Sequence, residues 1–193
     1  MRRIEDILAT VFGAIFIVLA FTVTVETLVR KIFNFSLQGV DELGGYSLAI
    51  GSTLAFALAV VGRNHIRVDV FHDRFPRGLK AVLNWLSIVL LAALALLFVL
   101  VSWRVLSESL EYGSTAQTPW ATPLIYPQSL WYAGLVLFLL MAAGFAARAT
   151  WLLASGRIDE LNEEFHAKSA KEELKEELED LKHRQAETAG DTP

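Results

Sequence analysis

The chain has no cysteine among its 193 residues and only five prolines. The absence of cysteine excludes disulfide bonds, thiolate metal sites and cysteine nucleophiles. Charged side chains are missing from long stretches: residues 44–62, 81–103 and 127–147 contain no Asp, Glu, Lys or Arg, and residues 7–29 contain only Glu26. Because so few polar residues remain to coat a water-soluble globule, the sequence indicates a membrane protein.

Each of these four apolar stretches is long enough to cross a bilayer, since about 20 helical residues span the hydrocarbon core. Trp85 and Trp103 lie near the ends of the third stretch, as expected for aromatic rings at the two membrane interfaces. The sequence therefore predicts an all-α integral membrane protein whose residues 1–155 form one domain. Its four transmembrane helices are expected at about 7–29, 44–62, 81–103 and 127–153.

Basic residues are distributed unequally between the two ends of these helices. One end carries Arg2, Arg3, Arg63, Arg67, Arg74, Arg77, Lys80, Arg148 and Arg157. The other end carries only Arg30, Lys31 and Arg104. Because cytoplasmic segments of membrane proteins are enriched in Lys and Arg, both termini and the connection between the second and third helices are predicted to be cytoplasmic.

Residues 156–193 form an acidic cytoplasmic tail that we expect to be partly helical and then disordered. Its charges alternate in sign, and Leu174, Leu178 and Leu181 make a short apolar stripe at helical spacing. The stripe is too short for a coiled coil. Two interpretations stay open, a solvated and partly frayed helix or a helix that docks onto a partner, with disorder expected from Gln185 onward.

Small residues recur every four positions along the second helix, at Ser47, Gly51, Ala55 and Ala59. Helices in lipid associate through close packing of small residues, so this stripe is expected to face another helix. The alternative is that glycine and alanine are simply common in membrane helices.

Polar residues gather at the membrane edges and are scarce within the apolar stretches. Pores, proton relays and substrate sites normally need ionisable groups or helix breaks near the midplane, and this chain has neither. The chain is therefore not expected to carry a solute alone. At one edge, Glu26 and Arg30 are four residues apart, a spacing that favours an ion pair, and Asp41 and Glu42 precede the second helix.

Residues 62–76 form the densest polar segment, with His65, Asp69, His72 and Asp73 among several arginines. One interpretation is a basic cytoplasmic loop that contacts anionic lipid headgroups. The other is metal or haem ligation by the two histidines, which is disfavoured because a haem bundle needs imidazoles facing each other from different helices. No cofactor is expected in this chain.

Prolines at 119, 123 and 127 recur in the connection between the third and fourth helices. Because proline fixes φ, this connection is expected to be extended and fairly rigid. It is either a contact surface for a partner, together with Trp131 at the start of the fourth helix, or a stiff linker.

Several segments resemble the small membrane subunit of tripartite ATP-independent periplasmic (TRAP) transporters. They are Arg30-Lys-Ile-Phe-Asn-Phe-Ser, Asp41-Glu42-Leu43, Gly62-Arg-Asn-His65-Ile-Arg-Val-Asp69 and the stretch from Thr122 through Pro127 to Trp131. The similarity covers roughly residues 5–153, and His-Ile-Arg-Val-Asp is its most specific element. The acidic tail lies outside it.

The resemblance implies a four-helix subunit of the bacterial inner membrane with both termini in the cytoplasm. Such a subunit pairs with a large permease subunit that contains the substrate and sodium sites, and a periplasmic binding protein delivers an organic acid to the complex. The small subunit would be a stationary scaffold, in contact with membrane lipids and with no nucleic acid. Which organic acid is carried is decided in the partner chains.

The residues expected to matter are therefore structural and interfacial. Arg30 with Glu26 and Glu42 is expected to anchor the outer edge. His65, Arg67 and Asp69 are expected to fix the inner edge, and Arg63 is a further structural or interface candidate.

Two functions of other classes stay open. The chain could be an independent homo-oligomeric channel in which Glu26 from several copies forms a cation-selective ring. It could also be a membrane anchor that presents the acidic tail to a soluble partner.

Overall fold

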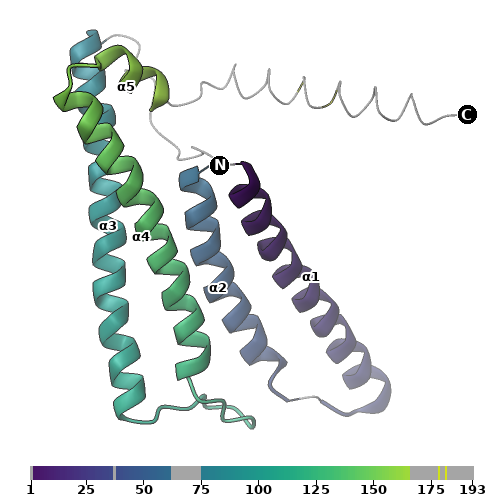
Figure 1. The fold of residues 1–193 in the computed structure, drawn as a ribbon. Helices are drawn as coiled ribbons and strands as arrows, with labels where there is room; N and C mark the ends of the chain where they lie inside the picture. Colours follow the sequence, from purple (N-terminus) through teal and green to yellow (C-terminus); the bar gives the residue numbers. More distant parts are fainter. Residues whose placement is uncertain (1, 37, 62–74, 166–177, 179–180, 182–193) are drawn as a thin grey trace, which may run out of the picture.

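The computed structural model describes residues 2–36, 38–61, 75–165, 178 and 181. Its five named helices are α1 (Arg2–Phe33), α2 (Val40–Val61), α3 (Arg77–Glu111), α4 (Ile125–Ala154) and α5 (Ile158–Glu164) (Figure 1). The first four are long and apolar enough to cross a membrane. The prediction of an all-α chain with four such helices is confirmed.

All four long helices begin before the apolar stretches that predicted them, and α1, α3 and α4 also end after them. The apolar stretch marks only the part of a helix that faces hydrocarbon, whereas the helix ends where the backbone can no longer continue. In α3 that point is Gly113, whose φ of +60° follows the last turn. There the Ser114 N–H bonds to the Ser109 carbonyl at 3.0 Å, so that a left-handed glycine closes the helix.

The four long helices pack in the order α1, α2, α4, α3, so that α1 and α3 lie at the two edges of the bundle (Figure 1). One end, which we name the hairpin end, holds the α1–α2 connection (34–39) and the α3–α4 connection (112–124). The other, which we name the terminal end, holds the start of α1, the end of α4 and α5.

The middle of the bundle is built from small residues. Ala57, Ala95 and Ala142 are completely buried and lie in one apolar cluster with Val60 and Phe138. Small side chains at these positions let neighbouring helices approach closely, which is how helices associate in lipid.

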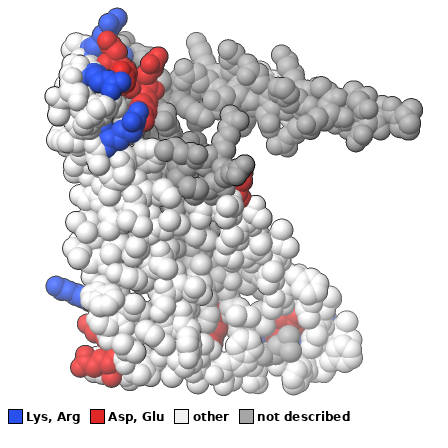
Figure 2. All heavy atoms as spheres, viewed as in Figure 1, with Lys and Arg blue, Asp and Glu red and all other residues white. Residues whose placement is uncertain are grey.

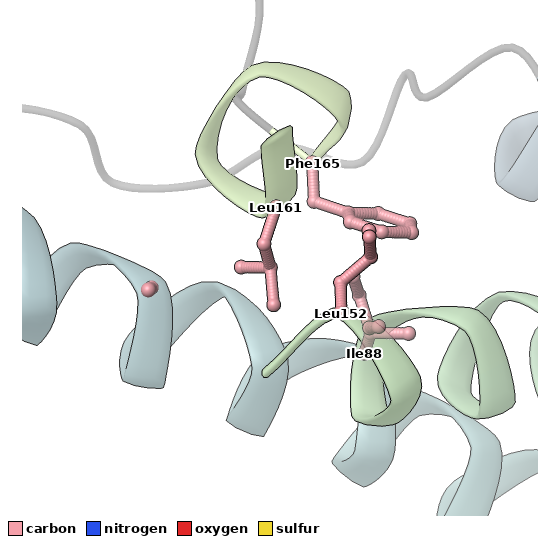
Figure 3. Packing of buried hydrophobic residues seen from close by; sticks show 6 residues of the cluster. Ile88, Leu152, Leu161 and Phe165 are labelled. Atoms are coloured by element: carbon pink, nitrogen blue, oxygen red, sulfur yellow. The ribbon is translucent and has the colours of Figure 1, made fainter. Parts of the chain in front are cut away.

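A tight turn directs the chain from α4 back onto the bundle as α5. Gly156, with φ of +69°, follows α4, and the Arg157 N–H bonds to the Leu152 carbonyl at 3.0 Å. The short helix then places Leu161 and Phe165 against α3 and α4. Figure 3 shows both side chains directed at Leu152 and Ile88.

Candidate functional site

The hairpin end contains a buried carboxylate at the end of α1. Glu26 is only 4% exposed, and its Oε1 accepts hydrogen bonds from Arg30 Nη2 at 2.6 Å and from Ser36 Oγ at 2.7 Å. Arg30 Nε donates a third bond to the same oxygen at 3.0 Å. The i,i+4 pair expected from the sequence is therefore present, and Ser36 ties it to the α1–α2 connection.

A second buried carboxylate begins α2. Glu42 is 7% exposed, and the Tyr46 hydroxyl donates to its Oε2 at 3.0 Å. Asp41 beside it is exposed. The sequence grouped Glu42 with Arg30, whereas the structure gives Glu42 a tyrosine partner on its own helix. Residues four apart lie on the same face of a helix, so the Tyr46 hydroxyl reaches the Glu42 carboxylate.

The α3–α4 connection folds back on itself and does not run extended. Thr115 and Pro123 form an antiparallel bridge, and the Ala116 N–H bonds to the Thr122 carbonyl at 2.9 Å. This fold carries Trp120 onto the α1–α2 connection, where its ring covers Gly39.

Gly39 cannot be replaced there without strain. Its φ is +113°, and a Cβ at this position would overlap the Trp120 ring. The two connections of the hairpin end are therefore joined by an aromatic ring packed on bare backbone. Sequence reasoning missed this contact, and its only signal is a glycine just before the acidic start of α2.

The small-residue stripe of α2 lies partly against α1. Gly51 is buried, and a Cβ there would come within 2.6 Å of the Phe16 ring. Ser47, Ala55 and Ala59 are half-buried. On its other side α2 meets α4, where Thr53 packs directly on Gly134.

An apolar groove of about 780 Å³ lies between α1, α2 and α4. Tyr46 and Ser47 are among its lining residues, the rest of which are aliphatic or glycine. Pro127 in the first turn of α4 and Trp131 one turn later are half-buried.

The terminal end is held by contacts between residues far apart in sequence. Asn84 Nδ2 donates to Asn162 Oδ1 at 3.2 Å, and Asn162 Nδ2 donates to the Arg77 carbonyl at 3.1 Å. Arg148 on α4 pairs with Glu164 on α5. Figure 2 shows charged residues gathered around α5 and at the opposite end, with an uncharged band between them.

Trp85 of α3 adds a further tie, because its Nε1 donates to Thr150 Oγ1 on α4 at 2.9 Å. The sequence predicted a partly helical tail from residue 156 but not that its first helix, α5, packs back onto α3 and α4. The available signal was Leu161 and Phe165, four residues apart just after the Ser-Gly that ends α4.

The residues predicted to fix the inner edge, His65, Arg67 and Asp69, lie outside the described residues, as does the further candidate Arg63. The same holds for His72, the second candidate metal ligand. Among the residues that the structure does describe, no group of three or more His, Cys, Asp or Glu side chains could hold a metal ion.

The chain was also compared with known proteins. No curated protein sequence matches it. Residues 18–151 match the family of tripartite ATP-independent periplasmic transporters, DctQ component. That match runs from within α1 to near the end of α4 and so includes both connections of the hairpin end. It covers more than half of the chain, and the residues in it include the segments that suggested the same family from sequence. The protein belongs to the DctQ family, and it is thus the small membrane component of a TRAP transporter and not an enzyme.

Proposed function

We propose that this chain is the scaffold subunit of a sodium-coupled importer of organic acids. Components of this family work with a large permease and a substrate-binding protein. In this proposal the large permease contains the substrate and sodium sites, and the small subunit holds its stationary part in place while the transporting part moves.

The distribution of buried polar groups carries the proposal. Glu26 and Glu42 are buried near the hairpin end, and Asn84 is buried where α3 meets α5. Between these levels the described helices pack mainly through alanine, valine and phenylalanine. The buried polar residues there are the hydroxyl residues Thr53 and Ser102, and the Thr53 hydroxyl donates to the Ile50 carbonyl of its own helix. A solute or ion path would need ionisable groups or helix breaks at that depth, whereas a rigid support needs only tight packing and fixed ends.

We further propose that the hairpin end faces the periplasm and the terminal end faces the cytoplasm of a bacterial inner membrane. The excess of Lys and Arg at the terminal end supports this orientation. The binding protein would then approach the hairpin end, and membrane lipids would cover the apolar faces that no subunit covers.

The test is sodium-driven uptake by the large permease, purified and reconstituted with and without this chain. We expect uptake of the organic acid to need the small subunit, and to stop when the sodium gradient is collapsed. Full uptake by the large permease alone would overturn the scaffold role. Uptake that needs this chain but not a sodium gradient would overturn the coupling alone.

The geometry of Glu26 argues against an independent channel. A selectivity ring needs carboxylates that face a common lumen, whereas Glu26 is buried and bonded to Arg30 and Ser36 of its own chain. Recording conductance from the purified chain tests the channel directly, and a Glu26-dependent current would favour the channel.

The other alternative is a membrane anchor for a tail-binding partner. Such an anchor would not need the four-helix packing or the contact between the two connections.

A further inference from the structure

Three arginines at the terminal end each pair with a carboxylate of α5. The pairs are Arg148 with Glu164, Arg157 with Glu160 and Arg77 with Asp159. Arg148 Nε on α4 donates to Glu164 Oε1 at 2.5 Å, and Arg157 Nε in the turn before α5 donates to Glu160 Oε1 at 2.7 Å. Figure 2 shows basic and acidic side chains intermixed around α5. The arginines of α3, α4 and the turn therefore share one source of counter-charge, a helix of seven residues.

Two of these arginines lie beside a tryptophan that marks a membrane interface. Arg148 is one turn before Trp151 on α4, and the guanidinium carbon of Arg157 lies 5.1 Å from the centre of the Trp151 ring. Trp151 itself is 53% exposed. Because tryptophan concentrates at the level of the lipid headgroups, both arginines are placed where lipid phosphates lie. A guanidinium group binds a phosphate with the same fork of N–H donors that it offers to a carboxylate.

The exposure of the two ion pairs makes their carboxylates replaceable. The side chain of Arg148 is 52% exposed and that of Arg157 is 44% exposed, so a molecule from outside can reach both. Exposed ion pairs contribute little to stability, because water screens them and two mobile side chains must be ordered. A lipid phosphate at either guanidinium would therefore exchange one anionic partner for another.

The charge of α5 opposes that exchange. The helix contributes no basic side chain, and it carries four carboxylates, those of Asp159, Glu160, Glu163 and Glu164. Three of them pair with the arginines, and Glu163 is exposed beside them. Charges within about 8–10 Å of each other still interact at physiological salt, so these carboxylates repel an approaching phosphate. The docked helix therefore cancels the positive charge that the arginines would otherwise present to lipid.

The docking of α5 has a basis other than these ion pairs. Leu161 is completely buried and Phe165 is 6% exposed, in one apolar cluster with Ile88 and Leu152 (Figure 3). The Asn162 side chain adds hydrogen bonds to α3. Neutral side chains in place of the carboxylates should therefore change the local charge while α5 stays docked.

We propose that Arg148 and Arg157 form a binding site for the phosphate of an anionic phospholipid, which the carboxylates of docked α5 occupy. Glu164 and Glu160 take the place of the headgroup, and α5 thereby keeps anionic lipid away from the end of α4. Because lipid and docked α5 compete for the same guanidinium groups, each weakens the binding of the other. The site requires neither the large permease nor sodium, so its failure would leave the proposed function untouched.

The test is native mass spectrometry of the purified chain with phosphatidylglycerol, and with phosphatidylcholine as the lipid of no net charge. The α5 variant combines Glu160→Gln with Glu164→Gln. The control combines Glu108→Gln with Glu111→Gln, which removes the same charge from two exposed residues at the hairpin end. We expect the α5 variant alone to bind phosphatidylglycerol about tenfold more tightly than the natural chain, with no change for phosphatidylcholine.

A further variant tests which arginines are responsible. Adding Arg148→Gln and Arg157→Gln to the α5 variant should abolish the gain in phosphatidylglycerol binding. A gain that survives these two changes, or an equal gain in the control, would overturn the site. Tighter binding of inorganic phosphate than of phosphatidylglycerol would also overturn it, because the ligand would then be a free anion. An unchanged affinity of the α5 variant would overturn the competition.

A measurement on the natural chain needs no variant to fold. The Leu161 N–H bonds to the Arg157 carbonyl at 3.1 Å, and the Phe165 N–H bonds to the Leu161 carbonyl at 3.0 Å, so both amides report the helical state of α5. We expect their hydrogen exchange to be several-fold faster in nanodiscs of phosphatidylglycerol than in nanodiscs of phosphatidylcholine. Equal or slower exchange in phosphatidylglycerol would overturn the competition.

Discussion

The two ends of the bundle are stabilised by different kinds of side-chain contact. At the hairpin end, the bonds of the two buried carboxylates join residues close in sequence, Arg30 with Glu26 and Tyr46 with Glu42. Tyr46 also contacts the Thr122 side chain of the α3–α4 connection, and the Trp120 ring joins the two connections. At the terminal end, α5 contributes buried apolar side chains and hydrogen bonds to residues about 80 positions away. We therefore expect the stability of the hairpin end to depend on backbone conformation. We expect the stability of the terminal end to depend on how much apolar surface is buried there.

This difference fits the roles that we propose for the two ends. A periplasmic surface that receives a binding protein needs a fixed outline, which two joined connections provide. A cytoplasmic end needs to keep α3 and α4 together. The α5 helix does so from outside the matched family region, which ends at residue 151.

The largest predicted effect is at the terminal end. Leu161 is completely buried between α3, α4 and α5, so Leu161→Ala leaves a cavity and should lower the free energy of unfolding by about 2–5 kcal/mol. The measurement is equilibrium unfolding in mixed micelles, followed by tryptophan fluorescence. Leu178→Ala is the matched control, since Leu178 is 49% exposed and should cost little. Equal losses in both variants would mean that α5 does not stabilise the bundle.

The next effect is at the hairpin end and tests backbone shape. Gly39→Ala introduces a Cβ at a φ of +113° and against the Trp120 ring, and it should lower the free energy of unfolding by about 1–3 kcal/mol. Gly44→Ala is the control, because a Cβ at Gly44 meets nothing within 4 Å. Combining Gly39→Ala with Trp120→Ala separates the backbone strain at position 39 from the overlap between the new Cβ and the Trp120 ring. If the Trp120 ring really lies on Gly39, the two substitutions together should cost less than the sum of each alone.

Whether a feature of the fold or of the site could be predicted from the sequence depends on how far apart in the sequence the interacting residues are. The four spanning helices follow from apolar stretches, because a bilayer forces such stretches to form helices. The Glu26–Arg30 pair follows from i,i+4 spacing on one helix. Trp120 on Gly39 could not be foreseen, because it depends on how two separate connections fold. Asn162 and Leu161 were missed for a similar reason, since their partners lie on α3 and α4, and a seven-residue helix has too short a pattern to stand out.

A smaller effect is expected from the charge of Glu26. Glu26→Gln keeps the shape of the side chain but removes the charge that Arg30 and Ser36 bind, so we expect a loss of about 1 kcal/mol in the free energy of unfolding. Glu108→Gln at the same end is the control, because Glu108 is exposed on α3. A loss in Glu26→Gln no larger than in the control would show that local polar bonds contribute little to the hairpin end.

The smallest effect should come from the exposed ion pair at the terminal end. Arg77 Nη1 and Asp159 Oδ1 are 3.9 Å apart, and both side chains are more than four-fifths exposed, at 86% and 85%. Water and salt screen such a pair, and ordering two mobile side chains offsets most of the attraction. Asp159→Asn should therefore leave the unfolding midpoint unchanged at low and at high salt. Glu164→Gln is the variant for comparison, because Glu164 is more buried than Asp159 and is bonded to Arg148 on α4. This substitution should lower the unfolding midpoint. A clear, salt-dependent loss in Asp159→Asn would mean that surface charge, and not the packing of Leu161 and Phe165, holds α5 in place. The two ends of the bundle would then both depend on polar contacts.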